Sequence, residues 1–175
     1  GNTGNPGAAE YLKPLLNDSS LEVRVATVGS LGNLNQFEIL IPELNDSYWE
    51  VRQRAALSLG SFADPRVPQL LMSLSQDQRW EVRQAAAISL GNFNQPLDID
   101  YLKPFLDDNL WMVRQAAVIS LGNFNQPQAI DYLKPFLDDD YLEIRLAAVN
   151  SLGNFTDPQI VDVLIPALND YDWQV

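Results

Sequence analysis

The chain has 175 residues, 46% of them hydrophobic, and its 23 acidic and 11 basic side chains give a net charge of −12. This charge argues against nucleic acid and against an anionic membrane surface, because both bind through Lys and Arg. There is no Cys and no His, which removes the usual thiolate nucleophile, the usual general base and the common ligands of zinc, iron and copper. With neither a continuous apolar run long enough to span a bilayer nor a leader pattern, we expect a cytoplasmic protein without a membrane span.

A repeated unit recurs along most of the chain. The stretch that begins at Trp111 is matched one unit earlier at Trp80 and one unit later at Leu142. Self-similarity at such a period is typical of solenoids. We therefore expect residues 8–175 to form a single repeat array. Residues 1–7 carry no periodicity, and we expect a flexible N-terminal segment or a cloning remnant there.

The first half of each unit predicts a helix with a kink. In the stretch 96–107, the spacing of Ile99, Leu102 and Phe105 is helical. Pro104 lies inside this helix, where it removes a backbone hydrogen bond and should kink the chain. The same place in other copies is taken by Pro14, Pro42, Pro135 and Pro166, and in the third copy by Ser73.

The second half of each unit predicts a helix that is buried on most sides. The stretch 110–123 is apolar nearly all round, which favours a position between layers. Its inward stripe is expected at Val113, Ala117, Leu121 and Phe124. A glycine closes every copy, and we expect each to be a left-handed C-terminal cap; these residues are Gly32, Gly60, Gly91, Gly122 and Gly153. The step from Val23 to Val51 is shorter than the later steps, which places a shorter turn after the first copy.

The stretch Asp46–Arg52 (DSYWEVR) and its counterparts at Asp77–Arg83, Asp108–Arg114 and Asp139–Arg145 resemble short HEAT-like repeats, especially those of the phycobilisome-lyase type. Together with the helix pattern, this resemblance implies an all-α solenoid, a right-handed superhelix of about five antiparallel helix pairs plus one extra helix. It also implies a stacked ladder between the Asp of each turn and the Arg of each second helix. The acidic partners are Asp18, Asp46, Asp77, Asp108, Asp139 and Asp170, and the basic partners are Arg24, Arg52, Arg83, Arg114 and Arg145.

A helical wheel of the second helices predicts an outward line that is partly apolar. The line runs through Gln53 and Leu57, then Gln84 and Ile88, then Gln115 and Ile119, and ends at Leu146. Contiguous exposed apolar surface often marks an interface, and the resemblance implies that this line faces a concave groove. The alternative is that long side chains or the curvature cover it. Trp49, Trp80 and Trp111 begin the same helices, either as binding anchors or as residues packed over the turn beneath them.

These features favour a non-enzymatic scaffold that binds a protein or peptide with apolar and neutral-to-basic surface. We expect no cofactor and no metal, because the acidic cluster Asp138–Asp140 is more typical of a solvated turn than of a calcium site. The alternative function, implied by the resemblance, is an accessory or chaperone subunit of bilin attachment. A designed array is a third possibility, against which the irregular step from Val23 to Val51 argues.

Overall fold

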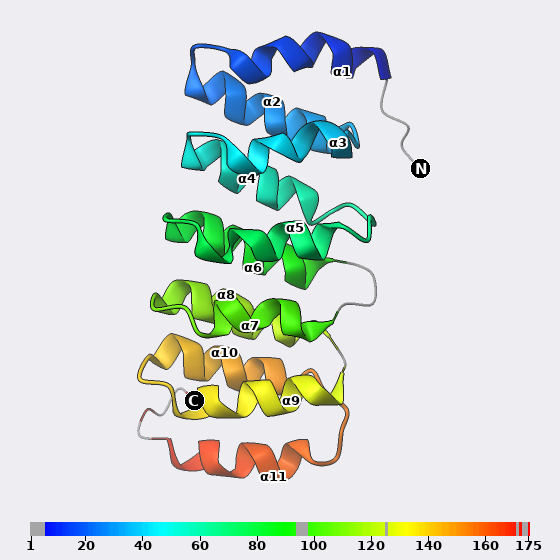
Figure 1. Ribbon diagram of the computed structural model, residues 1–175. Helices are drawn as coiled ribbons and strands as arrows, with labels where there is room; N and C mark the ends of the chain where they lie inside the picture. Colours follow the sequence, from blue (N-terminus) through cyan, green and yellow to red (C-terminus); the bar gives the residue numbers. More distant parts are fainter. Residues whose placement is uncertain (1–5, 94–97, 125, 171, 173–174) are drawn as a thin grey trace.

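The protein is a stack of helix pairs in the computed structural model, which describes residues 6–93, 98–124, 126–170, 172 and 175. The array runs from α1 at one end to α11 at the other, and neighbouring helices along the chain are antiparallel (Figure 1). Six first helices alternate with five second helices within the described ranges. The predicted all-α solenoid of five helix pairs plus one extra first helix is therefore confirmed. Helix α1 begins at Pro6, shortly before the expected start of the array, and residues 1–5 lie outside the described part.

Each first helix consists of a short α-helical segment and a 3-10 segment. They are α1 (Pro6–Leu12) with η1 (Lys13–Asn17), α3 (Phe37–Leu40) with η2 (Pro42–Asn45), α5 (Val67–Ser73) with η3 (Leu74–Gln76), η4 (Ile99–Leu102) with α7 (Lys103–Leu106), α9 (Pro127–Leu133) with η5 (Lys134–Asp138), and α11 (Ile160–Leu164) with η6 (Ile165–Asn169). The second helices are α2 (Leu21–Asn33), α4 (Trp49–Leu59), α6 (Trp80–Asn92), α8 (Trp111–Leu121) and α10 (Leu142–Leu152).

The break inside the first helices follows the recurring proline. In the fifth first helix the α-helical segment stops at Leu133, just before Lys134 and Pro135. In the third first helix, where Ser73 replaces the proline, the α-helical segment continues to Ser73 itself. Because proline cannot donate the backbone hydrogen bond that an α-helical turn needs, its removal lets the α-helix run further. In the first, second, fifth and sixth first helices the predicted kink is thus a change from α-helical to 3-10 winding. In the fourth the order is reversed: the 3-10 segment Ile99–Leu102 comes first and Pro104 lies in the α-helical segment Lys103–Leu106.

The core lies between the two layers of helices and between successive second helices, which pack on one another from α2 to α10. The predicted inward stripe of α8, Val113, Ala117 and Leu121, is fully buried, and Phe124 is buried beyond it. Alanines such as Ala86 are also buried on these helices. Their small side chains let the second helices approach closely, so the layer of second helices is tight and continuous.

The glycines that end the second helices are not left-handed caps, and this expectation was wrong. Gly60 and Gly122 have φ of −61° and −65°, and no described glycine has a positive φ. For Gly32, Gly60, Gly91 and Gly122 the role is contact with the next repeat. A Cβ on Gly91 would lie 2.3 Å from Ser120 Oγ and 2.8 Å from Ser120 Cα. Glycine is therefore required because a serine of the following second helix occupies the space that a side chain would need.

The short turn after α2 is closed by Asn35, the one described non-glycine residue with a positive φ, 60°. The backbone N–H of Asn35 donates to Gly32 O at 2.9 Å, and that of Gln36 donates to Leu31 O at 3.0 Å. This pair of bonds is the Schellman arrangement, in which Asn is the usual substitute for Gly. The tight turn explains how the first copy reaches the next first helix with fewer residues.

Candidate functional site

The predicted line of outward residues lies on the second helices, on the surface that we call the second-helix face. Leu57 on α4, Ile88 on α6 and Ile119 on α8 are 39%, 38% and 49% exposed, respectively. They occupy the same position in three successive repeats, so they form a row of solvent-facing aliphatic side chains. Leu146 on α10 holds the repeat position of the glutamines rather than that of the aliphatic row, and it is only partly exposed. The assignment of this row to solvent rather than to the core agrees with the helical wheel.

Two of the three glutamines of the line, Gln84 and Gln115, also hold the array together. Gln84 Nε2 donates to the backbone O of Met112 at 3.3 Å, and Gln115 Nε2 donates to the backbone O of Glu143 at 3.2 Å. Each bond reaches the first turn of the next second helix. Gln53, at the matching place on α4, is partly buried as well. The amides of Gln84 and Gln115 therefore have a structural role.

The tryptophans that begin the second helices pack against the core instead of standing free. Trp49, Trp80 and Trp111 are all partly buried and contact core residues. The guanidinium of Arg79 lies 4.6 Å from the ring centre of Trp49, and Trp111 stacks on Tyr141 with ring centres 5.9 Å apart. These contacts favour packing over the turn as their main role.

A row of carboxylates, which the sequence reading missed, runs beside the aliphatic row. Glu22, Glu50, Glu81 and Glu143 occupy the same position in the first turn of their second helices. Ser20 Oγ donates to Glu22 at 2.6 Å and lowers the pKa of that carboxyl, while Glu81 pairs with Arg79 at 2.8 Å. An acid at a helix N-terminus is stabilised by the helix dipole. The recurrence of Glu at one repeat position was the signal that could have revealed this row.

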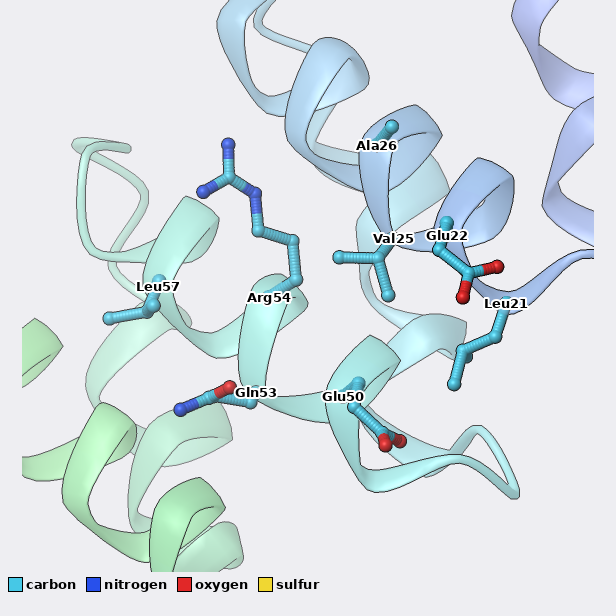
Figure 2. A pocket seen from close by; sticks show the side chains of 8 residues that line it. All are labelled: Leu21, Glu22, Val25, Ala26, Glu50, Gln53, Arg54 and Leu57. Carbon is cyan, nitrogen blue, oxygen red and sulfur yellow. The ribbon is translucent and has the colours of Figure 1, made fainter.

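Two grooves open on the second-helix face. The larger, of about 650 Å³, lies between α2 and α4 and contains Gln53 and Leu57 from the predicted line (Figure 2). Its remaining lining residues are Leu21, Glu22, Val25, Ala26, Glu50 and Arg54. The second, of about 520 Å³, lies between α8 and α10 and includes Gln115, Ile119 and Leu146. Both grooves combine an apolar floor with a carboxylate from the acidic row.

The predicted Asp–Arg ladder is present and links consecutive repeats. Arg52 Nε and Nη2 donate to the two carboxylate oxygens of Asp77 at 2.7 and 2.9 Å, and Nη1 donates to the backbone O of Asp46 at 2.8 Å. Burial raises the pKa of Asp77, but the bonds from Arg52 and from the Arg79 N–H outweigh it and leave this pKa below its usual value. The same pattern joins Arg83 to Asp108 and Arg145 to Asp170. Arg114 reaches Asp139 more weakly, because only its Nη2 approaches the two carboxylate oxygens, each at 3.5 Å. The ladder is structural, because its members are largely buried.

The first rung of the ladder differs from the others. Arg24 Nη1 donates to the backbone O of Asp18 at 2.8 Å, but its guanidinium lies 4.2 Å from the ring centre of Tyr48. No hydrogen bond from Arg24 to Asp46 is formed, and the buried Arg24 Nε has no partner among the described residues. An aromatic ring thus takes the place that a carboxylate holds in the later rungs.

Neither a metal centre nor a membrane helix emerges in the described ranges. No group of three or more acidic side chains there is arranged to hold an ion. No helix in this part of the chain has the length and apolar character needed to cross a bilayer.

Comparison with known proteins identifies the family of these repeats. The model of HEAT repeats matches residues 37–121 and 106–175, and no curated protein matches the chain by sequence. Among solved structures, the complex of CpcE and CpcF of phycocyanin lyase from Nostoc sp. PCC7120 is 22% identical with a TM-score of 0.69, over 94% of this chain and 71% of that one. YibA of Escherichia coli is 19% identical with a TM-score of 0.71, over 94% of this chain and 66% of that one.

A designed armadillo repeat protein in complex with the peptide (KR)4 is also similar, with 18% identity and a TM-score of 0.64 over 94% of this chain and 93% of that one. Identities of this size establish the shared solenoid fold. The match to the family model extends over most of the chain and includes the turn and second-helix motif of the ladder. The chain belongs to the HEAT repeat family.

Proposed function

We propose that the protein is a non-enzymatic scaffold that binds an extended segment of a partner protein along the second-helix face. The observation that carries this proposal is the row of Leu57, Ile88 and Ile119, each more than a third exposed in three adjacent repeats. A soluble surface seldom leaves aliphatic side chains in contiguous rows unless they bind something. Helices pack about 8–10 Å apart, so the row spans roughly 20 Å, and an extended segment of about six residues covers it.

The chemistry of the partner follows from what lies beside the row. The carboxylates of Glu22, Glu50 and Glu143 favour Lys or Arg, and the aliphatic side chains favour apolar residues. The likeness to a designed repeat protein that is in complex with a (KR)4 peptide supports a basic segment as occupant. The partner in this proposal is a cytoplasmic protein with a segment that mixes apolar and basic residues.

Affinity capture with a matched pair of variants tests the proposal. Ile88→Glu with Ile119→Glu places charge in the row, and because both side chains face solvent, the circular dichroism spectrum and Tm should stay close to those of the unmodified protein. Quantitative mass spectrometry should then show that the captured partner is lost. Asp100→Ala with Asp131→Ala, on the first helices, is the control and should retain it. A folded double Glu variant that still captures the same partner would exclude this face.

A role in bilin attachment is the second candidate, favoured by the likeness to the complex of CpcE and CpcF of phycocyanin lyase. In that case a free bilin should bind the protein and change its absorbance spectrum on titration. This titration separates the two candidates, since a scaffold for peptides gives no spectral change with bilin.

A further inference from the structure

The groove between α2 and α4 contains the side chain of Arg54, whose guanidinium has no partner among the described residues. Of the 11 Lys and Arg residues, ten contact a carboxylate, a backbone carbonyl or an aromatic ring in the described part of the chain. Arg54 has no such contact there, and its side chain is exposed in the groove. In a chain with a net charge of −12, a guanidinium left without an internal acceptor indicates an external one.

The local sequence makes room for this side chain. Every other copy has Ala at the position of Arg54, and every later copy has Leu, Ile or Asn at the position of Gly29. A Cβ on Gly29 would lie 2.3 Å from Arg54 Nη2 and 2.4 Å from Nε. The guanidinium therefore rests directly over Gly29, where the aliphatic row would otherwise continue onto α2. These two exchanges replace an aliphatic side chain by a positive charge at one end of the row.

The surroundings of Arg54 suit a ligand that carries a negative group at one end and a positive group at the other. In Figure 2 the guanidinium lies at one end of the groove, the carboxylates of Glu22 and Glu50 lie at the other, and Val25 lies between them. Gly29, beneath the guanidinium, is about two helical turns along α2 from Glu22, which corresponds to about 10 Å. An extended peptide covers that distance in about three residues.

We infer that this groove binds the C-terminus of a partner protein, with the terminal carboxylate on Arg54, a terminal aliphatic side chain on Val25 and Leu57, and a Lys or Arg about three residues upstream at Glu22 and Glu50. A guanidinium binds a carboxylate through two parallel hydrogen bonds. A C-terminal aliphatic residue carries its carboxylate and its apolar group on one Cα, as the adjacent cation and apolar floor require. An Asp or Glu side chain offers the carboxylate without an aliphatic group of that size. This inference rests on the proposed peptide-binding role of the second-helix face.

The probe is the tetrapeptide acetyl-Lys-Gly-Ala-Leu, compared with the same peptide ending in an amide. Titration followed by NMR should shift the Arg54 Nε–Hε resonance and the amides of Val25 and Leu57. We expect the acid to bind about twofold to fivefold more tightly than the amide, the difference expected for one solvent-exposed ion pair. Arg54→Gln should remove this preference and leave the affinity for the amide unchanged. Equal binding of acid and amide, a preference that survives Arg54→Gln, or no shift with millimolar peptide would each overturn the inference.

Two further variants locate the ligand within the groove. Gly29→Ala keeps every charge but places a methyl group where the guanidinium rests, so it should reduce the preference for the acid while its Tm stays equal or rises, because Ala favours a helix. Exchange of the peptide's Lys for norleucine should weaken binding to the unmodified protein but not to the double variant Glu22→Gln with Glu50→Gln, which lacks both carboxylates. The probe is too short to reach Ile88 or Ile119. If these peptide tests fail while the Ile88→Glu and Ile119→Glu variant loses the captured partner, this inference alone is overturned and the proposed function stands. If the folded double Glu variant still captures the partner, the proposed function is excluded, whatever the peptide tests show.

Discussion

The glycines at the ends of the second helices should respond in opposite ways to the same substitution. Gly91→Ala gains about 1 kcal/mol from helix propensity. However, its Cβ would lie 2.5 Å from Ser120 Cβ and 2.8 Å from Ser120 Cα, and this backbone atom cannot move away without shifting the helix. Overpacking costs about 1–3 kcal/mol. Displacement of Ser120 also endangers its 2.9 Å bond to Ala87 O, which adds about 1 kcal/mol. The expected net loss is about 1–3 kcal/mol.

Gly153→Ala is the matched control, because the atoms nearest to its Cβ are carbonyl oxygens of its own helix end at 3.4 and 3.5 Å. With φ of −63°, Ala fits there without strain and should stabilise by up to about 1 kcal/mol. Urea unfolding followed by far-UV circular dichroism measures the free energy of unfolding of both variants. In thermal unfolding, each kcal/mol of that free energy moves Tm by about 2–4 °C in a chain of this size. Equal losses in the two variants would mean that the glycines act as backbone caps, and equal gains would mean that the helices separate freely. Either result contradicts the close-contact explanation.

Four further substitutions test the polar contacts. Ser89 Oγ is buried without a partner among the described residues, so Ser89→Ala should keep or raise the urea midpoint, whereas Ser120→Ala should cost about 1 kcal/mol. Arg114→Ala leaves Asp139 without its cation and should cost about 1.5–3 kcal/mol, and an unchanged unfolding midpoint would remove the ladder from the stability of the array. Glu43 holds a position that is apolar in every other repeat, and burial raises its pKa. Its contribution to stability is therefore present in acid and lost as pH rises through that pKa. Glu43→Leu should raise Tm at neutral pH, with a gain that shrinks in acid, and a gain independent of pH would contradict this explanation.

The repeat pattern was sufficient to predict the fold, because each copy of the repeat independently predicts the same pair of helices. The helix pairs, the proline break, the buried stripe of α8 and the exposed row at Ile88 and Ile119 all follow from periodicity in one dimension. The role of the glycines could not be obtained this way, since a C-terminal cap and a close contact produce the same residue. The contact with Ser120 depends on the distance between two helices, which only the structure supplies.

The groove at Arg54 could not be predicted from the repeat pattern, because it depends on residues that differ between copies. Attention to what the copies share hides a position where one copy departs from the rest, and both Arg54 and Gly29 are such departures. Neither residue is informative alone. Their meaning comes from the guanidinium lying over the glycine, a contact between helices of two successive repeats.

The irregular first rung has a consequence for how the array opens. Between α6 and α8, the bonds of Ser120 and Gln84 cross the joint. Neither α2 and α4 nor α4 and α6 share a side-chain hydrogen bond among the described residues, but the Arg52–Asp77 pair joins the second and third repeats, whereas Arg24 rests on Tyr48 in place of a carboxylate. In a repeat protein, stability is a sum of repeat and nearest-neighbour terms, so the weakest joint sets where partial unfolding begins. Amide protons of α1 and α2 should then exchange with solvent sooner than those of α6 and α8. A ligand held between α2 and α4 would strengthen the joint that lacks an Arg–Asp pair, and binding would be detected as slower exchange throughout the first repeat.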